Sequence, residues 1–142
     1  MSASCPFCAI AASVSDSVLY QDELVVAFLD RQPIRPGHAL VVPKMHEPDF
    51  FALPDHISTR LLQVAKRMAR AQQSAFQPKR VGMLVAGFDI AHAHLHVVPM
   101  HDYHDITSKR MLDGVVRTAS AADIEASMGK LRRQLSGGTD PC

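Results

Sequence analysis

Residues 91–98 read A-H-A-H-L-H-V-V, and this alternation constrains the fold more than any other feature of the chain. Successive side chains of a β-strand point to opposite faces, so a period of two predicts a strand over residues 91–99. One face would pack on a core through Ala93, Leu95 and Val97. The other face would present three imidazoles, each about 7 Å from the next. These are His92, His94 and His96.

Three imidazoles on one face favour chemistry over packing, because a core gains nothing from three adjacent titratable rings. Imidazole titrates near neutral pH, acts as a nucleophile and donates hydrogen bonds to phosphate oxygens. A row of three can attack phosphorus, hold its oxygens and protonate a leaving group. Two histidines spaced H-x-H can also chelate zinc with a third ligand, so a zinc hydrolase remains an alternative.

The remaining pattern predicts an antiparallel α+β domain. Short β-prone runs cover residues 18–20, 23–30, 38–43 and 79–87, and Gln21-Asp22 is a plausible hairpin turn between the first two. A helix should follow Pro54, with apolar residues spaced by three and four. Its stripe is Ile57, Leu61, Val64, Met68, Ala71 and Ala75. Ser120 and Asp123 resemble a capping box that begins a last helix, and Gly137 suits its end. The stripe of that helix is Ile124, Met128, Leu131 and Leu135.

Length and charge narrow the class of protein. The 142 residues predict one domain over 1–135 and a flexible tail over 136–142. Fifteen Lys and Arg against 14 Asp and Glu leave no field of one sign, so we expect no nucleic-acid or membrane partner. No apolar run reaches the ~20 residues of a membrane span. The N-terminus lacks the features of a secretory signal, and we expect a cytoplasmic protein.

Three cysteines do not suit a disulfide framework, but Cys5 and Cys8 are spaced C-x-x-C. Such a pair can bind zinc, react in redox chemistry or occur incidentally. Two thiolates would need two further ligands to complete a tetrahedral zinc site. From spacing alone, these possibilities remain open.

Four blocks in order resemble the histidine triad (HIT) family of nucleotide hydrolases and transferases. They are C-P-F-C-A-I at 5–10, V-V-A-F-L-D at 25–30, P-G-H-A-L-V-V-P-K-M-H at 36–46 and H-A-H-L-H-V-V at 92–98. The resemblance covers residues 5–100, and the C-x-x-C leader is similar to a Hint-like bacterial branch. It implies a five-stranded antiparallel sheet with one long helix and a C-terminal helix. It also implies a homodimer that binds a purine nucleotide.

The resemblance assigns roles by position. The nucleophile would be His94, which would attack the α-phosphorus and form a nucleotidyl-histidine that water hydrolyses. His96 would bind phosphate oxygens or assist the leaving group, and His38 matches the family's fourth histidine. The family's nucleotide-binding positions match Phe7, Ile10, Phe28 and Asp30. Apart from the resemblance, Gly87 would be a nucleotide-binding residue because glycine lets the backbone approach phosphate closely. A structural zinc, not required for the chemistry, would be held by Cys5, Cys8, His46 and His92.

The chain departs from the family just before the triad. The nucleotide-binding branch has an Asn-x-Gly and a Gly-Gln-Ser or similar segment there, whereas residues 85–91 read V-A-G-F-D-I-A. Besides the zinc hydrolase, two functions therefore remain open. One is a hydrolase of nucleoside phosphoramidates, adenylylated amines or dinucleoside polyphosphates. The other is a purine-nucleotide-binding regulatory module with little catalysis.

Overall fold

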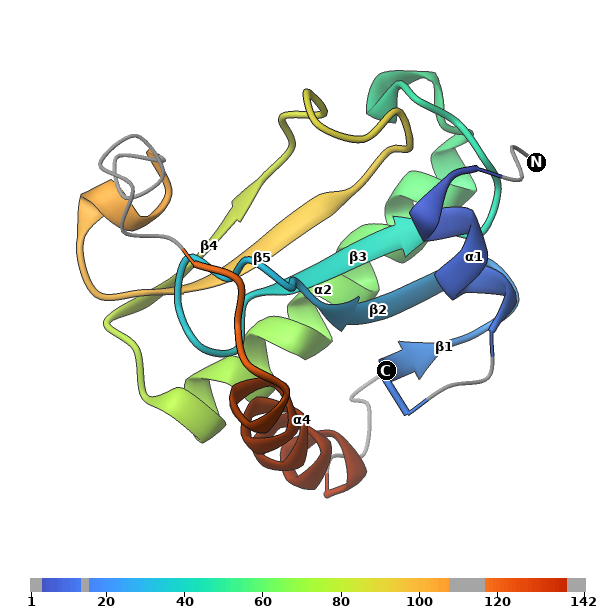
Figure 1. The fold of residues 1–142 in the computed structure, drawn as a ribbon. Coiled ribbons are helices and arrows are strands. Elements are labelled where there is room, and N and C mark those ends of the chain that lie inside the picture. The colour runs from blue at the N-terminus through green and yellow to red at the C-terminus, as the bar shows by residue number, and fades with distance from the viewer. Residues whose placement is uncertain (1–3, 14–15, 108–116, 138–142) are drawn as a thin grey trace.

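The computed structural model describes residues 4–13, 16–107 and 117–137, and it contains one five-stranded antiparallel sheet (Figure 1). The strand order is β1-β2-β3-β5-β4. The strands are β1 (Val18–Gln21), β2 (Val25–Leu29), β3 (Ala39–Pro43), β4 (Arg80–Leu84) and β5 (Leu95–Met100). The predicted α+β class with a five-stranded antiparallel sheet is confirmed.

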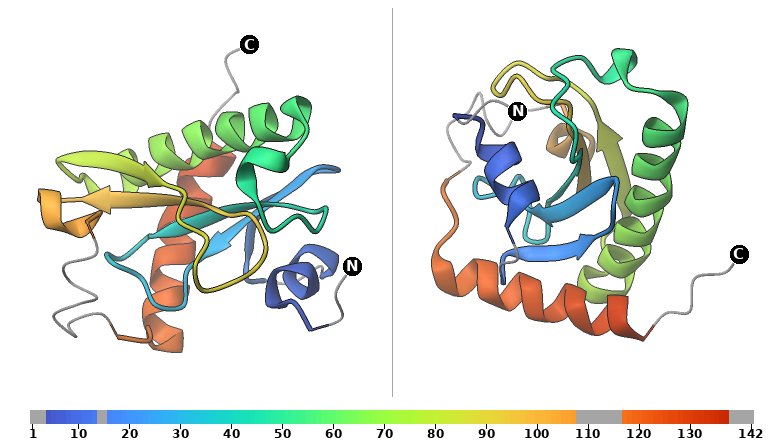
Figure 2. Two further views of the ribbon diagram at one scale, coloured as in Figure 1. Left: turned by 90° about the horizontal axis from the view of Figure 1, so that it is seen from above. Right: turned by 90° about the vertical axis from the view of Figure 1, so that its right-hand side faces the viewer.

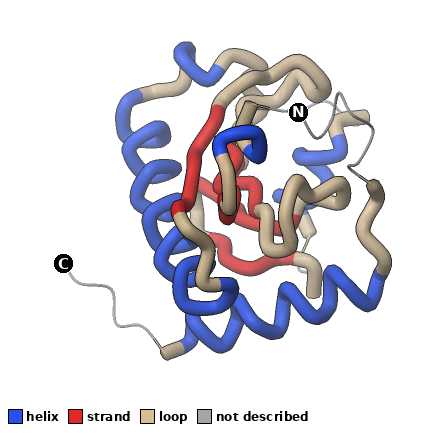
Figure 3. Tube along the Cα trace, turned by 90° about the vertical axis from the view of Figure 1, so that its left-hand side faces the viewer, coloured by secondary structure: helices blue, strands red, loops and turns tan. Residues whose placement is uncertain are grey.

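Helices cover both faces of this sheet. The long helix α2 (Asp55–Phe76) lies along one face, and α4 (Ala121–Ser136) packs against α2 and β1 (Figures 1 and 2). The short helix α1 (Pro6–Ala12) lies on the opposite face. Two 3-10 turns, η1 (Phe50–Ala52) and η2 (Tyr103–Asp105), complete the described elements. Figure 3 shows α2 and α4 bordering the sheet on two sides. Neither α1 nor the two 3-10 turns was predicted.

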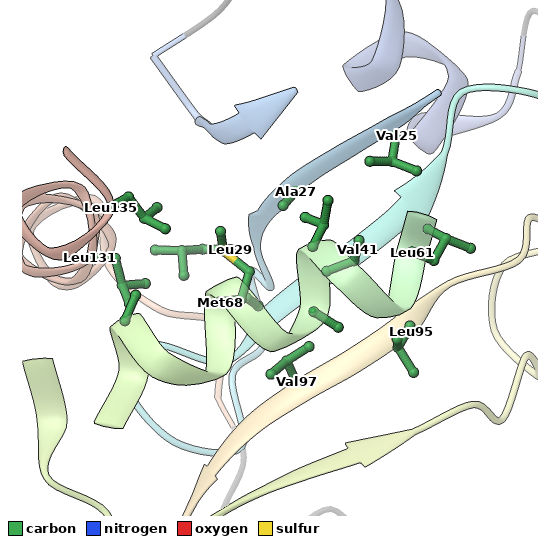
Figure 4. Close-up of a cluster of buried hydrophobic side chains, with 14 of the residues drawn as sticks. Val25, Ala27, Leu29, Val41, Leu61, Met68, Leu95, Val97, Leu131 and Leu135 are labelled. Carbon is green, nitrogen blue, oxygen red and sulfur yellow. The ribbon is translucent and has the colours of Figure 1, made fainter. Parts of the chain in front are cut away.

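Alternation along the central strands builds two cores. Odd-numbered residues of β2 and β3, such as Ala27 and Val41, face α2 and α4 in the larger core (Figure 4). Even-numbered residues, such as Phe28 and Leu40, face α1 in the smaller one. Because both faces are covered, every residue of β2 and β3 is buried. The smaller core is the one that adjoins the histidines.

Both predicted helices are confirmed. The stripe of α2 is buried as predicted except for half-buried Ala75, and Gln72 is buried beside it. Helix α4 begins where the Ser120 hydroxyl accepts a hydrogen bond from the Asp123 amide, and Gly137 follows its last turn. The hairpin between β1 and β2 is confirmed, but its turn is residues 22–24 and the predicted turn residue Gln21 belongs to β1. The Asp22 carboxylate accepts hydrogen bonds from the amides of Leu24 and Val25.

The predicted strand over 91–99 begins later than expected, at Leu95. Its apolar residues do face the larger core, but His92 and His94 precede the strand. The ladder between β3 and β5 starts with the Val41–Leu95 pair. Beyond it, the Ala93 amide donates to the Glu47 carbonyl, which draws the chain away from β3. The predicted strand over 79–87 is likewise shorter in the structure, where β4 spans only Arg80–Leu84.

Two sequence expectations fall on residues outside the described ranges. Most of the predicted tail, residues 138–142, lies there, as do residues 108–116. Within the described ranges, no helix is both long and apolar enough to cross a membrane.

Candidate active site and metal centre

The His94 ring is oriented by a carbonyl group two residues earlier in the chain. Its Nδ1 lies 2.7 Å from the backbone oxygen of His92. A carbonyl oxygen only accepts hydrogen bonds, so in neutral His94 the proton sits on Nδ1. The lone pair is then on Nε2, which no hydrogen bond engages within the described part of the chain. That arrangement leaves Nε2 able to act as a nucleophile.

A second pair of histidines forms a chain of hydrogen-bond donors. The Ile34 amide donates to Nδ1 of His38 at 3.1 Å, so the proton of neutral His38 sits on Nε2. That nitrogen lies 2.9 Å from Nδ1 of His96 and donates to it. Neutral His96 therefore carries its own proton on Nε2. The His96 ring packs edge-on against His94, with 5.0 Å between ring centroids, so a hydrogen-bond donor lies beside His94.

Burial keeps this pair neutral. Burial, together with a smaller contribution from the nearby His96, lowers the pKa of His38 to about 3. Burial, followed by the charge of His94, lowers the pKa of His96 to about 4. Burial also raises the pKa of Asp30, whose Oδ2 lies 3.6 Å from Nε2 of His38. Both rings are thus neutral at physiological pH, as the assigned tautomers require.

Four sulfur and nitrogen atoms converge on a point beside the smaller core. The ligand atoms of Cys5, Cys8, His46 and His92 all lie within 4.8 Å of one another. Nδ1 of His92 is 3.4 Å from Sγ of Cys5 and 3.5 Å from Sγ of Cys8, and Nδ1 of His46 is 3.3 Å from Sγ of Cys8. Two thiols and two imidazoles are a donor set typical of tetrahedral structural zinc. The four residues therefore fit zinc.

The tautomer of His92 suits this role. Its Nε2 lies 2.8 Å from the Pro43 carbonyl and must donate to it, which leaves the Nδ1 lone pair directed at the two sulfurs. Pro6 begins α1 and makes Cys5 its N-cap, so Cys8 follows one helical turn later on the same side. Local helix geometry thus brings the two sulfurs together.

The alternative metal arrangements do not match the geometry. Both ring nitrogens of His92 are committed elsewhere, so His92 and His94 cannot chelate one ion as an H-x-H pair. A second cluster of possible ligands, Asp30, His38 and His96, is also close together. Nε2 of His38 carries a proton there, because Nδ1 accepts from an amide, so this nitrogen has no lone pair for a metal.

The candidate metal site and His94 both adjoin the ring of Phe7. The ring of Phe7, which lies between the two cysteines, packs edge-on against His92 at 5.8 Å and His94 at 5.3 Å. It also contacts Phe28 at 5.4 Å. Phe7 and Phe28 are buried and Ile10 is half-buried in the smaller core. Three of the predicted nucleotide-binding residues are therefore in one cluster beside His94.

The other two predicted nucleotide-binding residues lie around this cluster. Asp30 follows β2 on the same side as Phe28 and approaches His38. With His38 it borders a cavity of about 540 Å³ that extends toward the start of α4 and that neither His94 nor His96 lines. Gly87 has a φ of +78°, which favours glycine, and a Cβ there would meet no described atom within 4 Å.

Sequence reasoning missed two positioning interactions. The buried Gln72 amide donates to the carbonyls of Gly37 and Val97, both at 2.8 Å, and these residues adjoin His38 and His96 in the chain. A polar residue beside the buried stripe of α2 was the available signal. Arg35 donates to the buried carboxylate of Asp105 at 2.9 Å and ties η2 to the loop before His38. Seventy residues separate this pair, and no local pattern announces it.

Comparison with known proteins decides the family, because a model of the HIT domain matches residues 11–103. The chain belongs to the HIT family. It is 32% identical over 107 residues to Protein hit of Bacillus subtilis, covering 71% of this chain and 74% of that protein. It is 34% identical over 104 residues to the adenosine 5'-monophosphoramidase HNT1 of Saccharomyces cerevisiae, covering 72% and 66%.

Solved structures of HIT proteins share the fold. A Zn-bound histidine triad family protein from Mycobacterium smegmatis superposes with a TM-score of 0.75 at 28% identity, covering 94% of both chains. A hypothetical histidine triad nucleotide-binding protein from Sulfolobus tokodaii gives 0.77 at 26% identity, covering 94% of this chain and 93% of that one. The resemblance found in the sequence is therefore confirmed at the level of family and fold.

Proposed function

We propose that this HIT protein is a nucleotide-binding hydrolase or transferase that cleaves its substrate at the α-phosphate through a nucleotidyl-His94 intermediate. The substrates are nucleoside phosphoramidates, adenylylated amines or dinucleoside polyphosphates, with a purine base. The observation that carries the proposal is the Nδ1 hydrogen bond of His94 to a carbonyl, which leaves Nε2 unprotonated. The similarity to a yeast adenosine 5'-monophosphoramidase supports this class of substrate.

The chemistry proceeds in two displacements. Nε2 of His94 attacks the α-phosphorus, and the bond from phosphorus to the leaving atom breaks with its electron pair going to that atom. A leaving amine takes up one proton from solvent. Water, or another acceptor, then attacks phosphorus and breaks its bond to His94, and one proton returns to solvent. With water the products are the free leaving group and a nucleoside monophosphate, and with another acceptor the nucleotidyl group is transferred to it. In both cases His94 is restored to its Nδ1–H tautomer.

The neighbouring residues would support the transferred group. The Nε2–H of His96 would donate to a phosphoryl oxygen or to the leaving atom, and His38 would hold His96 in the required tautomer. Asp30 would accept the ribose hydroxyls, whereas Phe7, Ile10 and Phe28 would border the base. Gly87 would let the backbone approach the phosphate.

We also propose that Cys5, Cys8, His46 and His92 hold a structural zinc ion. The ion would fix α1 against the segment that carries His94 and would leave no position open for substrate. The similarity to a Zn-bound relative supports the assignment. The chemistry itself requires no metal, so chelation should abolish activity only as the fold loosens.

The test is the His94→Ala variant with a panel of adenosine 5'-phosphoramidate, an adenylylated amine and diadenosine triphosphate. We expect the variant to fold, to retain zinc and to lose turnover of every compound that the natural protein cleaves. Mass spectrometry of the natural protein, quenched during turnover, should find a nucleotidyl group on His94. Turnover that persists in the variant would remove this mechanism.

The composition of residues 85–91 favours a second candidate, the purine-nucleotide-binding regulatory module. That segment lacks the Asn, Gln and Ser that would contact the phosphate and the leaving atom. Tight binding of AMP or GMP by the natural protein, with no cleavage of any compound in the panel, would establish this candidate over the hydrolase.

We further propose a cytoplasmic homodimer. β1 and β4 are the edges of the sheet, and the exposed Met83 lies on β4. A second copy would protect such an edge from unspecific pairing. Light scattering of the purified chain tests the dimer, and cell fractionation tests the location.

A further inference from the structure

The loop formed by residues 85–91 is connected to the histidine site at both of its ends. It begins after Leu84, the last residue of β4, which pairs with His96, and it ends immediately before His92 (Figures 1 and 2). Ile90 anchors the loop, because its side chain packs on the cluster of Phe7 and Phe28. The carbonyl of Ile90 also accepts a hydrogen bond from the His92 amide at 2.8 Å. The loop is therefore held beside the site.

Asp89 precedes this anchor, and its carboxylate is exposed. Its charge acts on two groups of the site at once: it contributes to the raised pKa of Asp30, and it opposes the lowering of the pKa of His96. His38 and His96 are neutral at pH 7, so they do not balance this negative charge. A carboxylate thus stands where the family's nucleotide-binding branch would place neutral side chains.

We propose, building on the proposed function, that Asp89 determines specificity for the leaving group. It favours phosphoramidates whose amine carries an additional positive charge, such as those of diamines, and it disfavours dinucleoside polyphosphates. The phosphorus must lie against His94 with its leaving group near His96, and so within range of the Asp89 charge. An ammonium on the leaving group is attracted by this charge, whereas a leaving phosphate is repelled.

Coulomb's law gives a smaller effect for two unit charges in water than at a protein surface, and an intermediate interaction of about 1.0–1.4 kcal/mol changes a rate ratio by about fivefold to tenfold at low salt. Because the carboxylate is exposed, the effect should shrink as ionic strength rises. The size of the change and its dependence on salt together distinguish an effect of the charge from an effect on the structure.

The experiment compares the natural protein with Asp89→Asn, which keeps the shape of the side chain and removes its charge. The control is Glu125→Gln, which removes an equal charge from an exposed position on α4. The substrates are the adenosine 5'-phosphoramidates of propylamine and 1,3-diaminopropane, and diadenosine triphosphate. The kcat/KM of each is measured at 20 mM and 300 mM NaCl.

We expect the natural protein and Glu125→Gln to prefer the diamine compound over the propylamine compound about fivefold to tenfold at low salt. In Asp89→Asn this preference should vanish, and turnover of diadenosine triphosphate should rise by a similar factor relative to the propylamine compound. Ratios that Asp89→Asn leaves unchanged within twofold would overturn the proposal.

A binding arm separates this proposal from the proposed function. Calorimetry with the propyl and 3-aminopropyl esters of AMP measures the same charge difference without turnover. If the natural protein cleaves none of the substrates but binds the aminopropyl ester more tightly, and Asp89→Asn removes that preference, the hydrolase proposal is refuted and the role of Asp89 is supported. If the natural protein cleaves the panel and Asp89→Asn changes no ratio, only the role of Asp89 is refuted. If the natural protein neither cleaves nor binds these compounds, both proposals are refuted.

Discussion

Replacing His38 by Gln should flatten the dependence of stability on pH. Burial lowers the pKa of His38 to about 3 in the folded chain, against 6.5 for an unperturbed histidine. Below pH 6.5 the unfolded chain therefore binds a proton that the folded chain does not. Stability contributed by neutral His38 is complete above pH 6.5 and is lost as the pH falls toward 3.

The magnitude follows from the separation of the two pKa values. Each pH unit below 6.5 costs about 1.4 kcal/mol per proton, so His38 lowers the free energy of unfolding by about 2 kcal/mol at pH 5. The full separation amounts to about 5 kcal/mol, which is reached below pH 3. Limiting the measurement to pH 5–8 keeps most carboxyl groups of the unfolded chain ionised.

Urea unfolding at pH 8, 7, 6 and 5 measures this effect for the natural protein and for His38→Gln. Their difference in unfolding free energy should shrink by about 2 kcal/mol between pH 8 and pH 5. The control is His104→Gln, which removes the same ring from an exposed position, and its profile should parallel the natural one. Parallel profiles for His38→Gln would refute the assignment of His38 as a buried neutral hydrogen-bond donor.

Two further predictions concern the supports of the site. Cys8→Ser should lose bound zinc, measured by atomic absorption, and its free energy of unfolding should fall by several kcal/mol. The control variant Cys142→Ser should retain both the zinc and the stability. Equal zinc content in the two variants would contradict the proposed ligand set. Gln72→Leu should lower the free energy of unfolding, measured with urea, by about 1 kcal/mol. The carbonyls of Gly37 and Val97 lose a donor, and removal of the buried, unpartnered Oε1 offsets part of that loss. The exposed neighbour variant Gln73→Leu should change it by less than about 0.5 kcal/mol.

The spacing of apolar residues in the sequence correctly predicted those parts of the fold in which one face of a helix or strand packs on the core. Ala93, Leu95 and Val97 are buried against α2 as the alternation required, and the stripe of α2 is buried with the one partial exception of Ala75. These predictions succeed because burial of an apolar face depends mainly on the spacing of residues within one element.

Periodicity failed where long-range hydrogen bonds decide the structure. The strand begins at Leu95 because the Ala93 amide donates to Glu47, a residue far away in the sequence. The pairing of Arg35 with Asp105 likewise joins two loops that no local signal connects. The first helix, seven residues long, has too few turns to show a helical period.

The proposed functions of the three histidines in the alternating run differ because their ring nitrogens have different partners. His92 uses all of its polar side-chain and carbonyl groups for positioning: Nδ1 faces the cysteine sulfurs, Nε2 donates to Pro43, and the carbonyl orients His94. Zinc at His92 would therefore act on the nucleophile through a single backbone carbonyl. Histidines at equal spacing in sequence are thus proposed to be a metal ligand, a nucleophile and a hydrogen-bond donor, and only the contacts of each ring distinguish them.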